Sequence, residues 1–320
     1  MAGATVPTMV LAELLPNPFA RLFSPDGPRL KERFIAWWEG YYLPTGKRRD
    51  QSGESAGDAG PADRNLSRSG KPIWTATRIE VAEKLWGTGF TGPGGTDLIP
   101  DLIHSLALTK AKSVLDLSAG LGGACRMMAE QQGSWVDGLE ANAVLAGVGM
   151  ERMTKAGLAK KSPIRHYDPE TFRWPKRVDV VFAREAFFTV ANKTDVARAV
   201  SAILKPGGQF LFTDYTLEEG AKAGPWTDAE PLEPHLCTAW EWVQRLREVK
   251  LDVRIVQDIS DQHLASITTA LRQFSAHLRA HELDHETLRA VQDEISLWGS
   301  RVAALSSGLR QYRFHAIRFA

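Results

Sequence analysis

The sequence predicts an α/β fold in which helices cover both faces of a parallel sheet. From residue 96 onward, segments with helical periodicity alternate with short apolar segments that have the length and composition of strands. The stretch SVLDLSAGLGGACRMMAE, residues 113–130, predicts a buried strand, a glycine-rich turn and a helix in succession, a layout typical of nucleotide-cofactor sites. A chain of 320 residues, 43% of them apolar, can bury a large core.

The individual elements follow from periodicity and from stop signals. Apolar residues recur at three- and four-residue spacing in 96–108, Gly133 and Gly157 end two further helices, and the tract KPGG, residues 205–208, closes a fourth. The expected helices are 96–108, 124–133, 143–157, 194–204, one that contains Trp240 and Trp242, and two between 261 and 303. The expected strands are 113–119, 134–142, 163–169, 178–186, 209–217, 251–259 and 311–319.

The N-terminal part differs in composition from the rest of the chain. Residues 45–72 are nearly devoid of apolar residues and rich in Gly, Ser, Asp and Arg, so we predict a flexible linker there. It would join an N-terminal helical extension, 1–44, to the main domain, 73–320. The segment 28–44 places aromatic and apolar residues near helical spacing. Such a helix would either dock onto the main domain or bind a membrane surface or a partner.

Composition and charge argue against several classes of partner and location. A net charge of +1 gives no general attraction to nucleic acid or to anionic membranes. No apolar segment approaches the roughly 18–20 residues of a membrane helix, and no basic segment precedes the first apolar residues as in a secretory signal. Cys125 and Cys237 form no disulfide framework and no metal-ligand spacing. We therefore expect a cytoplasmic protein with free thiols and no nucleic-acid partner.

The glycine-rich turn predicts a ligand site at the carboxyl edge of the sheet. Gly120, Gly122 and Gly123 let the main chain approach a ligand closely. A dinucleotide site would require the pattern G-x-G-x-x-G, but Ser118 stands where its first glycine should be. A pyrophosphate-binding turn therefore fits poorly.

Two carboxylates at successive strand ends sharpen this prediction. Glu140 ends the second strand, where its oxygens can accept both hydroxyls of a ribose. Asp168 ends the third strand, where it can accept the exocyclic amine of an adenine. One such carboxylate alone is more often a solvated surface group. Two of them beside one glycine turn favour an adenosyl ligand.

Four motifs in this order resemble those of class I S-adenosylmethionine-dependent methyltransferases. They are VLDLSAGLGG, VDGLEAN, VDVVFAREAFFTV and LKPGGQFLFTDYTL, and the resemblance covers about residues 80–220. It implies a Rossmann-like, seven-stranded, mostly parallel sheet whose last strand, 311–319, is antiparallel. The helices at about 261–303 would form a lid inserted before that strand.

The resemblance also implies the cofactor, S-adenosyl-L-methionine, and the residues that hold it. Asp116 and the glycines would face the methionine end, Glu140 the ribose and Asp168 the adenine. Ser118 departs from the glycine that is usual in the family. The full set assigned to the cofactor is Asp116, Ser118, Ala119, Gly120, Gly122, Glu140, Ala141, Asp168, Pro169, Ala183 and Arg184.

Within this class, the sequence is most similar to the phosphoethanolamine N-methyltransferase group, but it differs from that group at the positions of the catalytic residues. LWGTGFTGPGG, SAGLGG, FAREAFF and FTDYT look like the group's motifs. Phe90 stands in place of the group's catalytic tyrosine, Thr189 in place of its catalytic histidine, and Glu185 in place of its aspartate. The loop 218–235 is acidic and lacks the basic pair expected around a phosphate. We therefore carry over the cofactor site and not the phosphobase substrate.

Three residues are candidates for contact with the substrate. Glu185 could orient the substrate or accept a proton, or it could form a structural pair with Arg184. Tyr215 could close the cleft or simply pack, and Phe90 could exclude water or belong to the core.

His235 is an available base that could equally be solvated. Four tryptophans could line a pocket for a cationic product, although core positions are the commoner use; they are Trp226, Trp240, Trp242 and Trp298.

A metal site is not expected. The histidines of the predicted lid have no carboxylate partner at a fixed spacing, and surface histidines are common on polar helices. They are His263, His277, His281 and His285.

The favoured function is methyl transfer to a small molecule, at an amine nitrogen more than at another atom. One alternative is a phospholipid or phosphobase head-group methyltransferase that contacts a membrane through residues 1–44. A second alternative is a protein that binds the cofactor without catalysing a reaction, suggested by Phe90 and Thr189.

Overall fold

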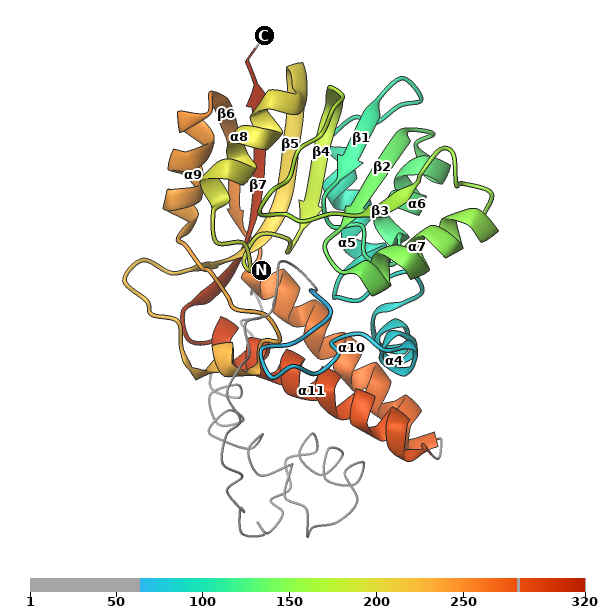
Figure 1. The fold of residues 1–320 in the computed structure, drawn as a ribbon. Helices are drawn as coiled ribbons and strands as arrows, with labels where there is room; N and C mark the ends of the chain where they lie inside the picture. The colour runs from blue at the N-terminus through green and yellow to red at the C-terminus, as the bar shows by residue number, and fades with distance from the viewer. Residues whose placement is uncertain (1–63, 281–282, 320) are drawn as a thin grey trace, which may run out of the picture.

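The computed structural model describes residues 64–280 and 283–319, which contain a seven-stranded sheet in the order β3-β2-β1-β4-β5-β7-β6 (Figure 1). β1 to β5 pair in parallel, and β7 runs antiparallel to both β5 and β6. The expected mostly parallel sheet with an antiparallel last strand is thereby confirmed. The strands are β1 Ser113–Asp116, β2 Trp135–Glu140, β3 Ile164–His166, β4 Val178–Arg184, β5 Leu204–Leu217, β6 Leu251–Asp258 and β7 Leu309–Arg318.

Helices cover both faces of the sheet (Figure 1). Apolar side chains of α5, α6 and α7 join one buried cluster, and those of α8 and α9 join a second. Along the central strand β4, Val180 and Phe182 belong to the first cluster and Val181 and Ala183 to the second. A strand covered on both faces must be apolar on both, which explains its continuous apolar sequence. The helices are α4 Ala76–Trp86, α5 Gly95–His104, α6 Gly123–Gln131, α7 Ala143–Lys155, α8 Lys193–Ile203, α9 Ala239–Glu248, α10 Ser260–Ala280 and α11 His285–Leu305, with a short 3-10 helix at Pro225–Ala229.

A helical cap closes the carboxyl edge of the sheet. α10 and α11 are the two helices expected before the last strand, and Figure 1 shows them beside α4 at the end of the sheet toward which β4 points. Phe274 of α10, Trp298 of α11 and Trp86 of α4 share one buried cluster with the sheet. The rings of Trp86 and Trp298 meet edge to face, with centroids 4.6 Å apart. The cap therefore shares the core of the sheet.

The main differences from the sequence-based expectation concern α4 and β5. α4 was not predicted, although Thr75 caps it by accepting a hydrogen bond from the Arg78 amide and Ile79 and Leu85 are buried. Its average hydropathy is near neutral, so the sequence signal is weak and the helix depends mainly on its packing against the cap. β5 starts at Leu204 and includes the tract KPGG, which was expected to end the preceding helix. A register shift between Val178 and Val180 shows that this tract bulges from the ladder.

The predicted N-terminal helix, 1–44, and most of the predicted linker lie outside the described residues. The rest of that linker, 64–72, contacts the main domain. Arg68 donates one hydrogen bond to the Glu233 carboxylate at 2.8 Å and another from its amide to the Pro231 carbonyl at 2.9 Å. Contacts with the domain thus begin before residue 73, the expected start of the domain. This segment has few apolar residues to bury, so polar side chains and the main chain make these contacts.

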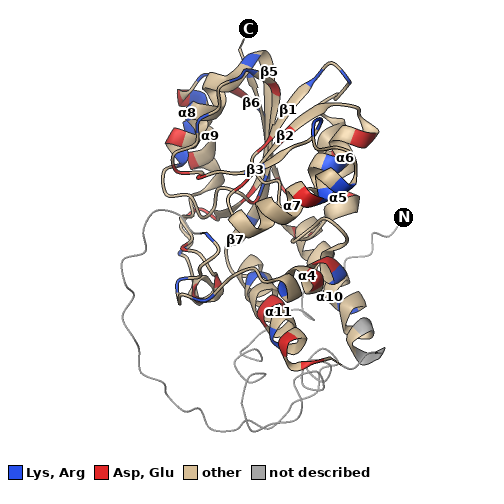
Figure 2. Ribbon diagram, turned by 45° about the vertical axis from the view of Figure 1, so that its right-hand side comes forward, with Lys and Arg blue, Asp and Glu red and all other residues tan. Residues whose placement is uncertain are grey.

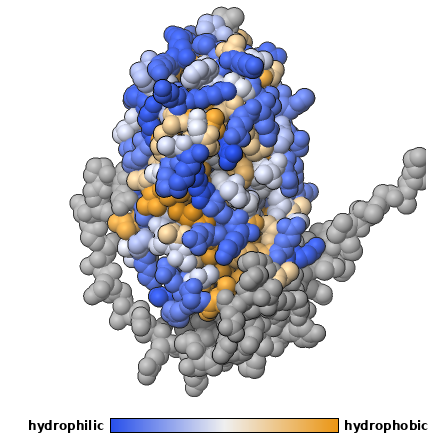
Figure 3. Space-filling model, turned by 90° about the vertical axis from the view of Figure 1, so that its right-hand side faces the viewer, coloured by the Kyte–Doolittle hydropathy of each residue, from blue (hydrophilic) through white to orange (hydrophobic). Residues whose placement is uncertain are grey.

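The described surface carries charges of both signs. Basic and acidic residues are interspersed along α8, α9 and α11 (Figure 2). On the face shown in Figure 3, hydrophilic side chains dominate the upper part, and apolar ones gather toward the middle and lower part. Within residues 64–280 and 283–319, no helix combines the length and apolar character that crossing a bilayer requires.

Candidate active site

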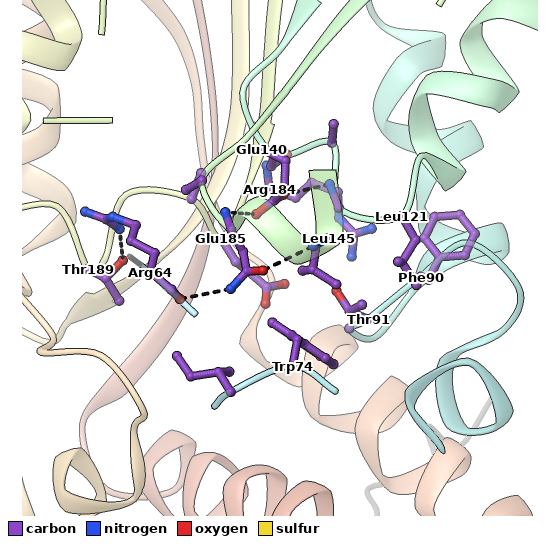
Figure 4. Close-up of a pocket in the computed structure, with 18 of the residues that line it drawn as sticks. Arg64, Trp74, Phe90, Thr91, Leu121, Glu140, Leu145, Arg184, Glu185 and Thr189 are labelled. Atoms are coloured by element: carbon purple, nitrogen blue, oxygen red, sulfur yellow. Dashed lines mark hydrogen bonds between the residues drawn. The ribbon is translucent and has the colours of Figure 1, made fainter. Parts of the chain in front are cut away.

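A cavity of about 260 Å³ lies where the loops after β1, β2 and β4 meet α11. Its other walls come from the segment around Arg64 and Trp74 and from the glycine-rich loop that contains Phe90. Figure 4 shows side chains from these separate segments converging on one space. The carboxyl ends of parallel strands and their following loops form the expected place for a ligand in such a sheet.

The glycine turn after β1 is shaped by its backbone and by Ser118. Gly120 and Gly122 have φ angles of 51° and 93°, which L-residues rarely adopt. The Ser118 hydroxyl donates to Asp116 Oδ1 at 2.9 Å and accepts from the Arg184 amide at 2.8 Å. The serine that replaces the usual glycine therefore links the end of β1 to the end of β4. Burial raises the pKa of Asp116, although hydrogen bonds from Ser118 oppose this shift.

Glu140 joins the glycine turn to the end of β2. Its Oε2 accepts a hydrogen bond from the Gly120 amide at 2.7 Å, and its Oε1 accepts one from the Asn142 amide at 2.8 Å. Burial raises the pKa of this carboxyl, while the two amides act in the opposite direction. Ala141 lines the cavity beside it. A carboxylate thus lies at the cavity wall, held between two main-chain donors (Figure 4).

Asp168 lies outside the cavity lining and binds its own loop. Its Oδ1 accepts from the Glu170 amide at 3.0 Å, and its Oδ2 accepts from the Thr171 hydroxyl at 3.1 Å. The preceding residue, Tyr167, lines the cavity instead and donates from its hydroxyl to the Leu117 carbonyl at 2.7 Å. Of the expected cofactor residues, Ser118, Ala119, Gly120, Glu140, Ala141 and Arg184 line the cavity, whereas Asp116, Gly122, Asp168, Pro169 and Ala183 do not.

The loop that carries Phe90 is fixed over the start of α6. The Gly123 amide donates to the Gly89 carbonyl at 3.0 Å, and the Gly89 amide donates to Glu83 Oε1 at 2.6 Å. Glu83 is also bonded by the guanidinium of Arg152 from α7. Phe90 is buried at the cavity edge. Because it lacks a hydroxyl, it can exclude water but cannot exchange a proton.

Replacing Gly123 with alanine should lower the free energy of unfolding by about 1–3 kcal/mol. A Cβ at this position would lie 2.5 Å from Phe90 Cζ and 2.7 Å from the Gly89 carbonyl oxygen, so the loop would have to move. Gly147→Ala in α7 is the matched control, because its added Cβ meets nothing within 4 Å. This control should raise the free energy by about 0.5–1 kcal/mol. Urea unfolding measures both; equal effects would contradict the close packing of the loop.

Glu185 follows β4 and has an unusual backbone conformation. Its φ angle is 51°, and its amide donates to the Thr213 carbonyl at 2.7 Å. A side chain other than glycine in this region stores strain that the surrounding structure must hold, and such positions are frequent at active sites. Glu185 Oε1 accepts from Gln311 Nε2 at 3.4 Å and lies 4.0 Å from His263 Nδ1. Arg184 directs its guanidinium to the Pro93 carbonyl rather than to Glu185.

Tyr215 and His263 form a buried pair behind Glu185. The Tyr215 hydroxyl and His263 Nε2 are 2.7 Å apart, and neither residue lines the cavity. Burial, assisted by Glu185, raises the pKa of Tyr215. Burial lowers the pKa of His263 to about 4, against the attraction of Glu185. The interpretation of His263 as a surface histidine is wrong, because the face of α10 that carries it packs against the sheet. The side chains of His277 and His281 lie outside the described residues.

The wall opposite the sheet carries two buried ion pairs. Arg301 of α11 donates to both carboxylate oxygens of Glu230, at 2.7 and 2.8 Å. Glu294, two turns earlier on the same face of α11, accepts from Arg78 Nε at 2.8 Å and from Trp298 Nε1 at 3.0 Å. All five residues line the cavity. Since each carboxylate is fully bonded, this wall offers aromatic surface and little free charge.

Aromatic residues reach the cavity from segments that the sequence did not identify. Of the four candidate tryptophans, Trp298 lines the cavity, whereas Trp226, Trp240 and Trp242 do not. Trp74 lines it as well, and Arg64 donates to the Thr189 hydroxyl at 3.2 Å (Figure 4). His235 is exposed and lies outside the lining. Arg64 and Trp74 precede the first expected element, so no periodicity or strand-end position could have indicated them.

Comparisons with known proteins agree with this architecture. A family model described as a methyltransferase domain matches residues 95–254. Phosphoethanolamine N-methyltransferase 1 of Zea mays is 23% identical over 241 residues, 75% of this chain and 48% of that protein. Sarcosine/dimethylglycine N-methyltransferase of Aphanothece halophytica is 36% identical over 104 residues, 32% of this chain and 37% of that protein. The chain thus spans about half the length, or less, of these curated relatives.

The fold is shared with a solved structure. Phosphoethanolamine N-methyltransferase 2 of Haemonchus contortus, in complex with S-adenosyl-L-methionine, aligns with a TM-score of 0.68 at 19% identity, covering 77% of this chain and 58% of that chain. This likeness concerns the course of the backbone, so the chemistry at the cavity has to be argued from the residues themselves.

Proposed function

Because the chain belongs to the methyltransferase-domain family, we propose that it transfers the methyl group of S-adenosyl-L-methionine to the nitrogen of a small amine. The cofactor is the one bound in the Haemonchus contortus structure, and the Zea mays and Aphanothece halophytica relatives are named as N-methyltransferases. The single observation that supports an amine is the carboxylate of Glu185 at the cavity.

The residues at the cavity fit S-adenosyl-L-methionine. The main chain of Ser118, Ala119 and Gly120 forms one wall, and a Cβ added at Gly120 would meet nothing closer than 3.9 Å. This open space leaves the backbone accessible to a ligand. Glu140 and Ala141 adjoin the turn, and the carboxylate of Glu140 suits a pair of ribose hydroxyls. When bound, the cofactor supplies an electrophilic methyl carbon on a sulfonium centre.

Glu185 is the acidic residue at the cavity with an incompletely bonded carboxylate. Four glutamates among the described residues line the cavity. Glu230 and Glu294 are bonded to arginines, and Glu140 to main-chain amides. The carboxylate of Glu185 accepts one hydrogen bond from the described residues, a long one of 3.4 Å from Gln311 Nε2, and lies 4.0 Å from His263 Nδ1. A carboxylate in this condition attracts an ammonium group, and nearby aromatic rings favour cations further.

The proposed reaction requires Glu185 to take a proton. In solution at neutral pH an aliphatic amine is protonated, as the lysine pKa of about 10.4 shows. Its nitrogen can attack only after it has lost that proton. Glu185 accepts that proton and holds the nitrogen in line with the methyl carbon. The nitrogen–carbon bond then forms as the carbon–sulfur bond breaks, and its electron pair leaves on sulfur. Phe90, Trp74 and Trp298 exclude water from the cavity.

The test is methyl transfer from isotopically labelled donor to three amines: sarcosine, dimethylglycine and phosphoethanolamine, with a cell extract as a fourth sample. Mass spectrometry should find the label on nitrogen. Label on oxygen, sulfur or carbon would contradict the proposal. Cofactor binding by calorimetry without any S-adenosylhomocysteine formation would indicate a non-catalytic binding protein.

Liposome flotation with and without residues 1–45 tests the head-group alternative, which requires lipid binding through a segment outside the described residues.

Replacing Glu140 with alanine should weaken S-adenosyl-L-methionine binding by roughly 10- to 150-fold, which corresponds to the loss of about 1.5–3 kcal/mol from charge-assisted hydrogen bonds. The change also leaves the Gly120 and Asn142 amides without their acceptor. Asp137→Ala is the control, because this acidic residue of the same strand pairs with Arg165 and lies outside the cavity lining. Calorimetry measures both variants; unchanged affinity of the first would remove Glu140 from the site.

A further inference from the structure

A buried row of polar side chains leads from the cap to Glu185. Arg301 of α11 lies over the Tyr215 ring, 5.4 Å from its centroid. The Tyr215 hydroxyl lies 2.7 Å from His263 Nε2, and His263 Nδ1 lies 4.0 Å from Glu185 Oε1. Tyr215 and His263 are almost fully buried and lie outside the cavity lining. Burying such groups is costly unless they are bonded, so their arrangement calls for an explanation.

Burial keeps both Tyr215 and His263 neutral. Burial raises the pKa of Tyr215, so its hydroxyl keeps its proton and is able to donate it to His263 Nε2 across the 2.7 Å contact. Burial lowers the pKa of His263 to about 4; Glu185 opposes this shift, whereas Arg184 and Arg301 add to it. The ring is therefore neutral at pH 7. With Nε2 as the acceptor of the Tyr215 hydroxyl, the single proton of a neutral ring resides on Nδ1, the ring nitrogen that lies 4.0 Å from Glu185 Oε1.

The contacts of Glu185 fall on one of its two oxygens. Gln311 Nε2 and His263 Nδ1 both face Oε1, at 3.4 and 4.0 Å. Among the described residues, no hydrogen-bond partner of Oε2 is found. The positive φ angle of Glu185 fixes the backbone from which the carboxylate projects. One oxygen is thus directed at the protein, and the other remains for a ligand in the cavity.

We propose that His263 is a positioning residue whose Nδ1–H holds Oε1 of Glu185 and so leaves Oε2 to take the proton of the substrate amine. This inference rests on the proposed amine methylation. At 4.0 Å the two atoms are not yet hydrogen-bonded; contacts between catalytic groups are commonly long in ligand-free structures and shorten in the complex. A neutral donor at Nδ1 can hold Oε1 of Glu185 both when the side chain is a carboxylate and after it has gained the amine proton. His263 itself transfers no proton.

The tautomer of His263 can be measured without any substrate. In the full chain with ¹⁵N-labelled histidine, long-range proton–nitrogen spectra should show His263 protonated on Nδ1 and bare on Nε2 between pH 6 and 8. The signal is assigned from its disappearance in the His263→Gln variant. His315 is an internal reference, because its Nε2 lies 2.9 Å from the Gln209 carboxamide oxygen and should carry the proton. A proton on Nε2 of His263, or an imidazolium ring, would overturn the proposal.

Two substitutions separate positioning from packing. His263→Asn keeps an amide donor near the place of Nδ1, whereas His263→Gln keeps an acceptor for Tyr215 and loses that donor. With whichever of sarcosine, dimethylglycine and phosphoethanolamine is methylated, kcat should stay within about 3-fold for the asparagine variant. For the glutamine variant it should fall roughly 10- to 100-fold, as expected for a misplaced catalytic group. The affinity for S-adenosyl-L-methionine should be unchanged in both.

A packing role predicts a different result, namely equal losses of kcat in both variants that follow their losses of Tm. That outcome would overturn the proposal. His315→Gln is the matched control, because His315 is also buried but lies away from the cavity lining; it should lower Tm and leave kcat unchanged. A failure of the proposed function is recognised separately: calorimetry would then show no cofactor binding, or mass spectrometry would find no labelled amine. The tautomer measurement then still decides whether Nδ1–H faces Glu185.

Discussion

Replacing Glu185 with glutamine should lower kcat/KM for the amine by about 10²- to 10⁴-fold, the range typical of losing a general base. At 1.36 kcal/mol per factor of ten, this corresponds to about 3–5 kcal/mol of transition-state stabilisation. Glutamine has the same shape but no charge, so it neither attracts the ammonium nor accepts its proton. Phe90 and Thr189 cannot supply this function, because one has no polar group and the other's hydroxyl accepts from Arg64.

The same variant should keep its affinity for S-adenosyl-L-methionine and its free energy of unfolding. Glutamine differs from glutamate only at the end of the side chain, so the positive φ angle of residue 185 strains it no more. The Gln311 amide still finds an oxygen acceptor. Asp179→Asn is the matched control. It removes a charge from β4, the strand that precedes Glu185, but at the other end of that strand, where Asp179 pairs with Lys205 at 2.7 Å. Methyl transfer by this control should be normal. If Glu185→Gln retained wild-type kcat/KM, the assignment of Glu185 as base would fail.

Replacing Arg301 with methionine should lower the free energy of unfolding by about 3–5 kcal/mol, because it leaves the buried Glu230 carboxylate without its partner. Both side chains are less than a tenth exposed, and two charge-assisted hydrogen bonds join them. The guanidinium also lies over the rings of Phe188, Tyr215 and Trp298, with which it would lose cation–π contacts. Urea unfolding at pH 7 measures this effect.

Two controls identify the cause of the loss. Arg126→Met removes an equal charge from an exposed pair with Glu130, which is worth at most about 1 kcal/mol. Adding Glu230→Gln to Arg301→Met should restore part of the lost free energy, since it removes the uncompensated charge. If Arg301→Met behaved like Arg126→Met, burial of the pair would not matter to stability. If the second substitution restored nothing, the loss would come from packing alone.

The sheet and part of the cavity lining could be predicted because they are encoded locally. The alternation of apolar strands and amphipathic helices specifies a two-sided parallel sheet, and the glycines at 120 and 122 specify a turn with positive φ angles. Glu140 follows from its position at a strand end. Asp168 occupies a similar position but turns into its own loop, because Thr171 and the Glu170 amide satisfy it there.

What the sequence by itself determined is therefore the fold, the glycine turn and the family, since each depends on residues that are close together along the chain. The tertiary structure alone decided which polar groups meet around the cavity. Tyr215 and His263 are 48 positions apart, and Arg301 and Glu230 are 71 apart. Periodicity shows which face of a helix is apolar, but it does not show which buried side chains of the cap will meet those of the sheet. That pairing arises only when α10 and α11 pack across the carboxyl edge and every buried polar group requires a partner.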